Sequence, residues 1–207
     1  MRNKRYFVVA ALLCAALATA GIAAAVLLVA LARHDFTFTY AAEHTSHNLP
    51  LGYSLSAFWG GQEGSLLLWL VILTGYAALA VWLNRRRRDL VVWTVPVFGL
   101  IAVCFSFMLC FVSSPFHQQP APADGAGMVP SLQNPYMVAH PPMLYLGYVG
   151  FTVPFAFAIA ALVTGRVGEG WLVETRRWTL VAWGFLTVGI VLGAWWSYEV
   201  LGWGGYW

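Results

Sequence analysis

The sequence predicts an all-α protein, a polytopic bundle of transmembrane helices with about five spans. Of its 207 residues, 60% are hydrophobic and only 9% are charged, which is far more apolar than a soluble domain. The apolar residues gather into stretches long enough to cross a bilayer, and the basic residues alternate between the segments that connect them. We therefore expect lipid to be the solvent of most of this chain.

Each predicted span is a run of roughly 20 mostly apolar residues, the length that an α-helix needs to cross the hydrocarbon core. The first run follows the basic start MRNKR, but it is too long for the apolar part of a secretory signal, and no clear cleavage site precedes Arg33. We expect one transmembrane domain, 1–207, with spans at 7–31, 66–83, 90–112, 143–164 and 178–196 and external loops at 32–65, 113–142 and 197–207.

The basic residues predict the orientation of the bundle. Ten of the eleven lysines and arginines precede the first span or lie between spans two and three or four and five. Because positively charged segments stay in the cytoplasm, we expect a cytoplasmic N-terminus and a periplasmic or equivalent external C-terminus, in a bacterial inner membrane. The arginine turn 85–88 is then a topology determinant that touches anionic lipid headgroups, and no nucleic-acid partner is expected.

The cysteines exclude two classes of protein. Cys14, Cys104 and Cys110 all fall inside predicted spans, where thiols pack as small hydrophobic groups. The sequence has no C-x-x-C pair, so a thiol–disulfide oxidoreductase is not expected, and no C-x-x-C-H, so it is not a c-type cytochrome. No histidine falls inside a predicted span, which disfavours a transmembrane haem held between facing helices.

The C-terminal stretch AWWSYEVLGWGGYW is unusually dense in aromatic residues, which alternate with glycines. Three glycines within four residues do not hold a regular helix, but they allow a backbone to lie close to a flat partner. Two interpretations stay open for this stretch. It is either a surface for a large planar apolar ligand or an interfacial aromatic belt.

His140 precedes Pro141 and Pro142 in the second external loop. Proline restricts the residue before it to extended geometry and is tolerated at the first helical positions, so the pair predicts the start of the fourth helix. His140 would then lie in a conformationally restricted segment at the membrane surface. Two interpretations stay open: it is a metal ligand or a solvated loop histidine. His117 lies in a Pro/Ala-rich run that we expect to be mobile.

The first external loop changes from polar to apolar at Gly60, Gly61 and Gly64. Glu63 is expected at the start of the second span, where a carboxylate is favourable to the helix dipole. His44 and His47, three residues apart, are able to share a helix face. Because no third ligand recurs nearby, we do not predict a metal site there.

The sequence resembles the CcmF/NrfE branch of the cytochrome c-type biogenesis proteins in three segments. They are GGQEGSLLLW, LQNP with HPPMLYLGYVGF, and WTLVAWGFLTVGIVLGAWWSYEVLGWGGYW. The resemblance implies a haem lyase subunit that attaches haem to apocytochrome c, with a haem chaperone and other maturation subunits as partners. Haem b would be bound without a covalent bond to this chain. By position, His140 matches an axial histidine of that family, and Trp195, Trp196, Trp203 and Trp207 belong to its haem-facing segment.

The sequence also departs from the family pattern, because the chain stops at Trp207 inside the tryptophan-rich signature. We therefore expect a part of a longer protein or the product of a split gene, which supplies one axial ligand and is not active alone. Two alternatives are a haem exporter or other transporter, and a non-catalytic assembly subunit that docks partner proteins on its aromatic external face.

Overall fold

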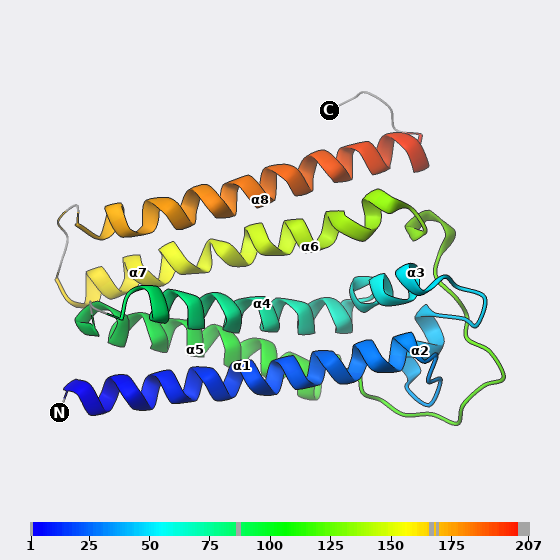
Figure 1. The fold of residues 1–207 in the computed structure, drawn as a ribbon, viewed down its shortest axis with the longest axis horizontal. Helices are drawn as coiled ribbons and strands as arrows, with labels where there is room; N and C mark the ends of the chain where they lie inside the picture. Colours follow the sequence, from blue (N-terminus) through cyan, green and yellow to red (C-terminus); the bar gives the residue numbers. More distant parts are fainter. Residues whose placement is uncertain (1, 86–87, 166–167, 169, 203–207) are drawn as a thin grey trace.

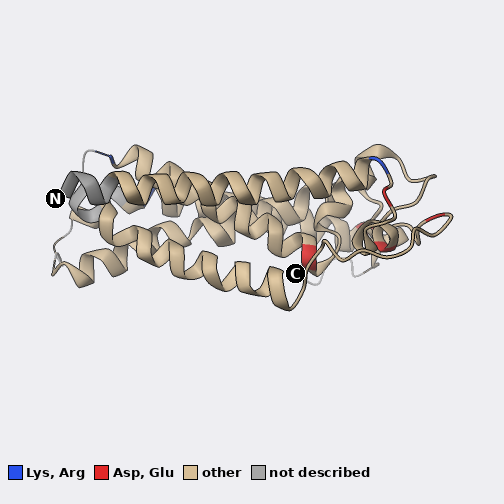
Figure 2. Cartoon of the chain, turned by 90° about the horizontal axis from the view of Figure 1, so that it is seen from below, with Lys and Arg blue, Asp and Glu red and all other residues tan. Residues whose placement is uncertain are grey.

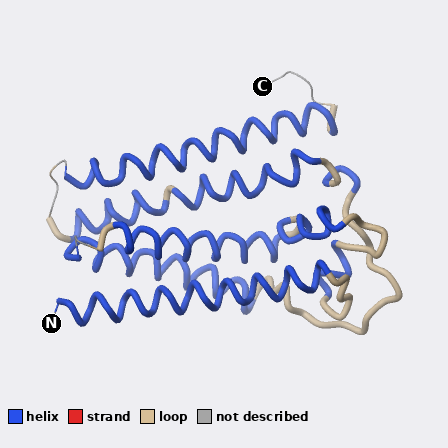
Figure 3. The backbone as a smooth tube through the Cα atoms, viewed as in Figure 1, coloured by secondary structure: helices blue, strands red, loops and turns tan. Residues whose placement is uncertain are grey.

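A computed structural model shows long helices that run side by side, with longer loops gathered at one end (Figure 1). The structure describes residues 2–85, 88–165, 168 and 170–202. Its helices are α1 (Arg2–Ala32), α2 (Thr39–His44), α3 (Leu51–Ser56), η1 (Ala57–Trp59), α4 (Gln62–Leu83), α5 (Arg88–Phe111), η2 (Pro130–Leu132), α6 (Pro135–Gly150), α7 (Thr152–Val163) and α8 (Gly170–Val200). The described chain contains no strand (Figure 3).

The structure confirms the predicted fold class, because five helical segments are long and apolar enough to cross a membrane. Their apolar side chains are largely on the outside. Only 11% of the most apolar part of α8 and 22% of that of α1 are buried within the chain. Exposed leucine, valine and phenylalanine side chains at this density need lipid or other helices as neighbours. The chain is therefore a multi-pass membrane protein.

Several helices extend beyond the boundaries that hydropathy predicts. α4 begins at Gln62 rather than at 66, and α8 runs from Gly170 to Val200 rather than over 178–196. The apolar run marks only the part of a helix that matches the hydrocarbon core. Backbone hydrogen bonding continues beyond it into the polar interface, where the sequence is no longer apolar.

The fourth span consists of two helices, α6 and α7, which meet at Phe151. Pro154 explains the break, because a proline has no N–H to donate to the carbonyl four residues earlier, here that of Gly150, and its ring crowds that turn. α6 then packs mainly against α8, whereas α7 packs mainly against α5. The span therefore changes partner halfway along its length.

α6 and α8 run antiparallel and lie very close together. A Cβ added to Gly147 would lie 2.7 Å from the Cβ of Leu186, and one added to Gly150 would lie 2.9 Å from the Cβ of Ala182. Small residues allow membrane helices to approach in this way and to gain dispersion energy along the whole contact. This close pair positions the candidate site.

The two longer loops, which join α1 to α4 and α5 to α6, meet at one end of the bundle (Figure 1). Phe38 and Gln118 form an isolated antiparallel bridge, and the Thr39 amide donates to the carbonyl of His117 at 2.9 Å. The His117 segment, which we expected from its sequence to be mobile, thus makes backbone hydrogen bonds with the first loop. Among the residues that Figure 2 colours, the acidic ones gather at this same end of the molecule.

Candidate functional site

The helix that carries His140 begins earlier than the prolines predict. Asn134 caps α6 by accepting a hydrogen bond from the Tyr136 amide at 2.8 Å, and Pro135 occupies the first helical position. Pro141 and Pro142 lie inside the helix. The predicted start at these two prolines is thus wrong, because a capped Asn–Pro pair upstream had already initiated the helix.

His140 consequently lies within an apolar helix, in the candidate span Pro135–Val163, rather than in a restricted segment before it. The expectation that no histidine falls inside a span is wrong for this residue. Its Nδ1 lies 2.7 Å from the carbonyl oxygen of Gly189 on α8. Since a carbonyl only accepts, Nδ1 carries the proton, and the free lone pair of the ring lies on Nε2.

Gly193, one turn beyond Gly189, completes the packing around His140. A Cβ at position 193 would lie 2.7 Å from the Nδ1 atom of His140, so only glycine leaves room for the ring at its present place. The imidazole is half-buried between the two helices. Both ring orientation and tautomer are thereby set by α8, which is the usual way in which a protein prepares a histidine ligand.

Trp195 and Trp196 lie near the end of α8 on different sides. The Trp195 indole N–H donates to the Glu199 carboxylate at 2.8 Å, its ring lies 5.7 Å from that of Tyr136, and it is 54% exposed. The Trp196 indole instead donates to the Ser131 carbonyl at 2.9 Å and so fixes the loop before α6. Trp203 and Trp207 lie outside the described residues.

The structure thus brings His140, Trp195 and Trp196 to the loop-bearing end of the α6–α8 helix pair. Sequence analysis missed three supporting features: Glu199, Tyr136 and the Gly189 carbonyl. The i, i+4 spacing of Trp195 and Glu199, and that of Gly189 and Gly193, were the available signals. Beside them, the Ser197 hydroxyl is buried and has no hydrogen-bond partner among the described residues, which is uncommon for a buried polar group.

His44 and His47, near the other loop, make ring contacts with neighbouring side chains. His44 stacks on Tyr40 at 4.2 Å between ring centroids, at the end of α2. His47 lies beyond that helix and packs against Phe36 at 5.0 Å and His34 at 5.7 Å. The two histidines therefore do not share a helix face, and no metal-binding group of three or more side chains occurs in the described part of the chain.

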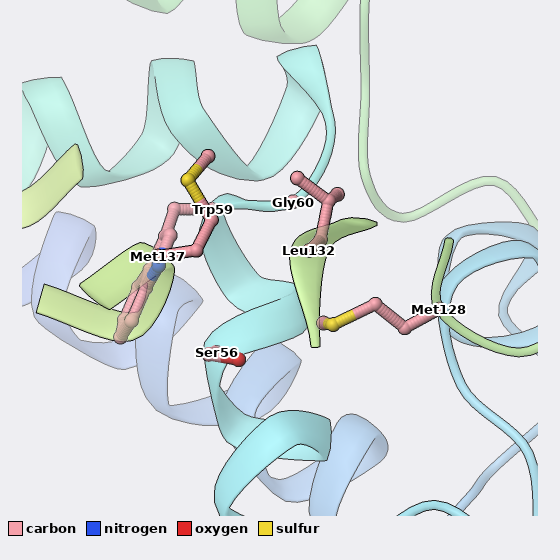
Figure 4. A pocket seen from close by; sticks show the side chains of 6 residues that line it. All are labelled: Ser56, Trp59, Gly60, Met128, Leu132 and Met137. Atoms are coloured by element: carbon pink, nitrogen blue, oxygen red, sulfur yellow. The ribbon is translucent and has the colours of Figure 1, made fainter. Parts of the chain in front are cut away.

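A small cavity of about 40 Å³ lies near the start of α6 (Figure 4). The close-up shows Trp59, Met137 and Leu132 around it, with Met128 and Ser56 completing the wall. A volume of this size is enough for about one water molecule. This cavity is therefore too small to hold a large planar ligand.

The fold and the site define a class of multi-pass membrane protein. Its α6 and α8 pack closely through glycines, and their loop-bearing end carries aromatic side chains and a histidine whose ring is oriented by a backbone carbonyl. Residues 59–207 match the family model described as Cytochrome C assembly protein. This chain belongs to that family, and its predicted resemblance to the CcmF/NrfE branch is confirmed.

Individual relatives agree with this assignment. The chain is 45% identical over 185 residues to cytochrome c-type biogenesis protein CcmF of Escherichia coli (strain K12), an alignment that covers 88% of this chain and 29% of that protein. It is 44% identical over 175 residues to NrfE of Haemophilus influenzae, covering 84% and 28%. A solved structure titled Cytochrome c Heme Lyase CcmF matches with a TM-score of 0.79 at 39% identity, over 96% of this chain and 31% of that one. The chain thus spans less than a third of the length of these relatives.

Proposed function

We propose that this chain acts in cytochrome c maturation. It would be the part of a haem lyase that holds haem at its external surface for covalent thioether attachment to apocytochrome c. The observation that carries the proposal is the hydrogen bond between His140 Nδ1 and the Gly189 carbonyl at 2.7 Å. It fixes the proton on Nδ1 and so leaves the lone pair of Nε2 available to bind an iron atom. Family membership supports the same assignment.

Haem is the substrate in this proposal and is not bonded covalently to the chain. Each thioether forms when a cysteine S–H of the apoprotein adds across a haem vinyl group: sulfur bonds to one vinyl carbon and the hydrogen goes to the other. The residues of this chain orient the macrocycle, His140 through one axial bond and Trp195 through its exposed ring face. A haem chaperone, apocytochrome c and other maturation subunits are the proposed partners, in a bacterial inner membrane.

The test is a histidine replacement with chemical rescue in the assembled membrane complex. His140→Ala should lower haem absorbance per protein about tenfold or more, because an axial bond is lost. Added imidazole should restore it by occupying the vacated coordination position. His117→Ala is the matched control, since His117 is an exposed loop histidine, and it should retain haem. Unchanged spectra after His140→Ala would remove the ligand assignment.

A transport function is the second candidate, because the fourth span is broken at Phe151. Discontinuous helices form the substrate sites of many transporters. This break, however, contains no charged side chain, and hydrogen bonds from the Phe151 amide to the carbonyls of Gly147 and Tyr148 satisfy part of the freed backbone. Haem flux into proteoliposomes that is abolished by Pro154→Ala would favour transport over a lyase role.

A further inference from the structure

A second cavity, of about 650 Å³, lies between α4 and α8 on the side of the bundle away from the long loops. Tyr76 and Leu83 of α4 line it, together with Val181 and Phe185 of α8. Its volume falls within the usual range of small-molecule sites. None of the residues predicted to contact haem takes part in it.

The fold itself creates this cavity. α6 and α8 stay in close contact as far as Gly150 and Ala182. The helix then breaks at Phe151, and α7 turns away toward α5. In this region α8 contacts α7 less extensively than it contacts α6, and the cavity lies between α8 and α4.

The cavity is polar at one end only. Arg177, Trp178 and Asn84 line that end, and the remaining lining is almost entirely apolar. The Asn84 side chain is held by donating to the Ala80 carbonyl at 2.9 Å, and the Tyr76 hydroxyl by donating to the Leu146 carbonyl at 3.0 Å. Arg177 is exposed and free to direct its guanidinium at a ligand.

The surrounding charge selects the ligand. In the sequence, arginines outnumber the three acids Asp89, Glu169 and Glu174 in the segments 85–89 and 166–177, which join α4 to α5 and α7 to α8. Basic pockets between transmembrane helices recruit anionic lipid headgroups. We propose that the cavity binds one anionic phospholipid, with an acyl chain between α4 and α8 and the phosphate at Arg177.

Haem is a poorer occupant, although it is also amphipathic and anionic. The described residues that line the cavity include no histidine, cysteine or methionine to bind its iron. A zwitterionic lipid would fit the apolar part equally well but would lack the net charge. The proposal thus predicts selectivity by headgroup charge, and it is independent of the haem-handling role.

The test compares two neighbouring arginines of α8. The protein is purified in mild detergent, phosphatidylglycerol or phosphatidylcholine is added, and bound lipid is counted by native mass spectrometry. Arg177→Gln should weaken phosphatidylglycerol binding about fivefold, the effect of one arginine at a lipid surface, and should leave phosphatidylcholine binding unchanged. Arg176→Gln, which removes the same charge from an exposed side chain outside the cavity, should have little effect.

A second variant tests the cavity rather than the charge. Val181→Trp adds a large side chain to the cavity lining and should reduce binding of both lipids. Val191→Trp is the control, because Val191 is exposed on α8 nearer its other end, and it should not reduce lipid binding. Equal losses from Arg176→Gln and Arg177→Gln would mean that only general surface charge matters. That result, or full lipid binding by Val181→Trp, overturns the proposal.

Discussion

Gly193 faces the His140 ring so closely that a side chain there must displace it. Because a Cβ would lie 2.7 Å from Nδ1, the imidazole would turn away from the Gly189 carbonyl and lose its fixed tautomer. Gly193→Ala should lower haem retention roughly tenfold, the usual effect of losing a partner of a metal ligand. Haem absorbance per protein in the purified complex measures this effect.

Gly184 provides the control on the same helix, because nothing lies within 4 Å of a Cβ added there. Gly184→Ala should leave haem retention unchanged and should stabilise the helix by up to about 1 kcal/mol. If Gly193→Ala retained haem as well as Gly184→Ala does, the position of His140 would not depend on α8.

Tyr40 is the central hydrogen-bonding side chain of the loop end. It is 3% exposed, and its hydroxyl donates to the Ala57 carbonyl at 2.8 Å and accepts from the Gly61 amide at 3.0 Å. Burial raises the pKa of Tyr40 well above its usual range, so the hydroxyl remains a donor at alkaline pH. It therefore holds the turn that precedes α4.

Tyr40→Phe should lower the free energy of unfolding by about 1–3 kcal/mol, because buried backbone groups lose their partner. Thermal unfolding in detergent measures the change. Tyr148→Phe, at a position that is 53% exposed, should have almost no effect. A loss of the same size in both variants would mean that the buried hydroxyl contributes nothing specific.

At the scale of elements, the sequence predicts the number and order of spans well, because bilayer thickness fixes how long an apolar helix must be. It does not predict where α6 begins, since the Asn134 cap and the two prolines are both valid start signals in isolation. Nor does it reveal that His140 bonds to Gly189, 49 positions away in sequence. That pairing depends on the α6–α8 register, which only tertiary packing determines.

Asp124 joins the two longer loops of the bundle. Its carboxylate accepts a hydrogen bond from the His47 amide at 2.9 Å and one from the Gly125 amide at 2.8 Å. These bonds, with smaller contributions from the nearby His47 and His34 side chains, lower the pKa of Asp124. A carboxyl with a lowered pKa stabilises the folded loops above its unfolded pKa of about 3.9, and this stabilisation is lost as pH falls through the lower folded value.

Asp124→Asn should therefore speed hydrogen exchange at the His47 amide severalfold at neutral pH, and the difference from the unmodified chain should vanish in strong acid. Exchange mass spectrometry of the loop peptides measures it. Asp35→Asn is the matched control, because Asp35 accepts only from Thr37 within its own loop. If both variants exchanged alike, the contact between the loops would not depend on Asp124.

At the scale of the whole molecule, burial is unequal among the spans. The most apolar part of α4 is 39% buried, whereas that of α8 is 11% buried. α8 nevertheless carries the Gly189 carbonyl at one end and Arg177 at the other. α8, of which little is buried within the chain, thus contributes residues both to the candidate haem surface and to the proposed lipid site. The bilayer orientation of the bundle decides which of the two faces the cell interior.

The charge distribution predicts that orientation. The starts of α1, α5 and α8 and the ends of α4 and α7 lie at one end of the bundle (Figure 1). In the sequence, ten of the eleven basic residues precede the first span or lie between spans two and three or four and five. Moving so many cations across a bilayer is unfavourable, so this end should stay in the cytoplasm. The loop end, with His140 nearby, should then face the periplasm, where a haem lyase must present its substrate.

Single exposed cysteines on opposite ends provide the measurement. Position 123 lies in the loop between α5 and α6, and position 168 lies between α7 and α8. Ala123→Cys and Gly168→Cys are each made in a chain whose Cys14, Cys104 and Cys110 are replaced by alanine. A membrane-impermeant maleimide applied to intact spheroplasts should label only the cysteine at position 123, and the one at 168 should react only after permeabilisation. The reverse pattern would place His140 on the cytoplasmic side. The haem surface would then be inaccessible to a periplasmic apocytochrome, and the proposed function would fail with the orientation.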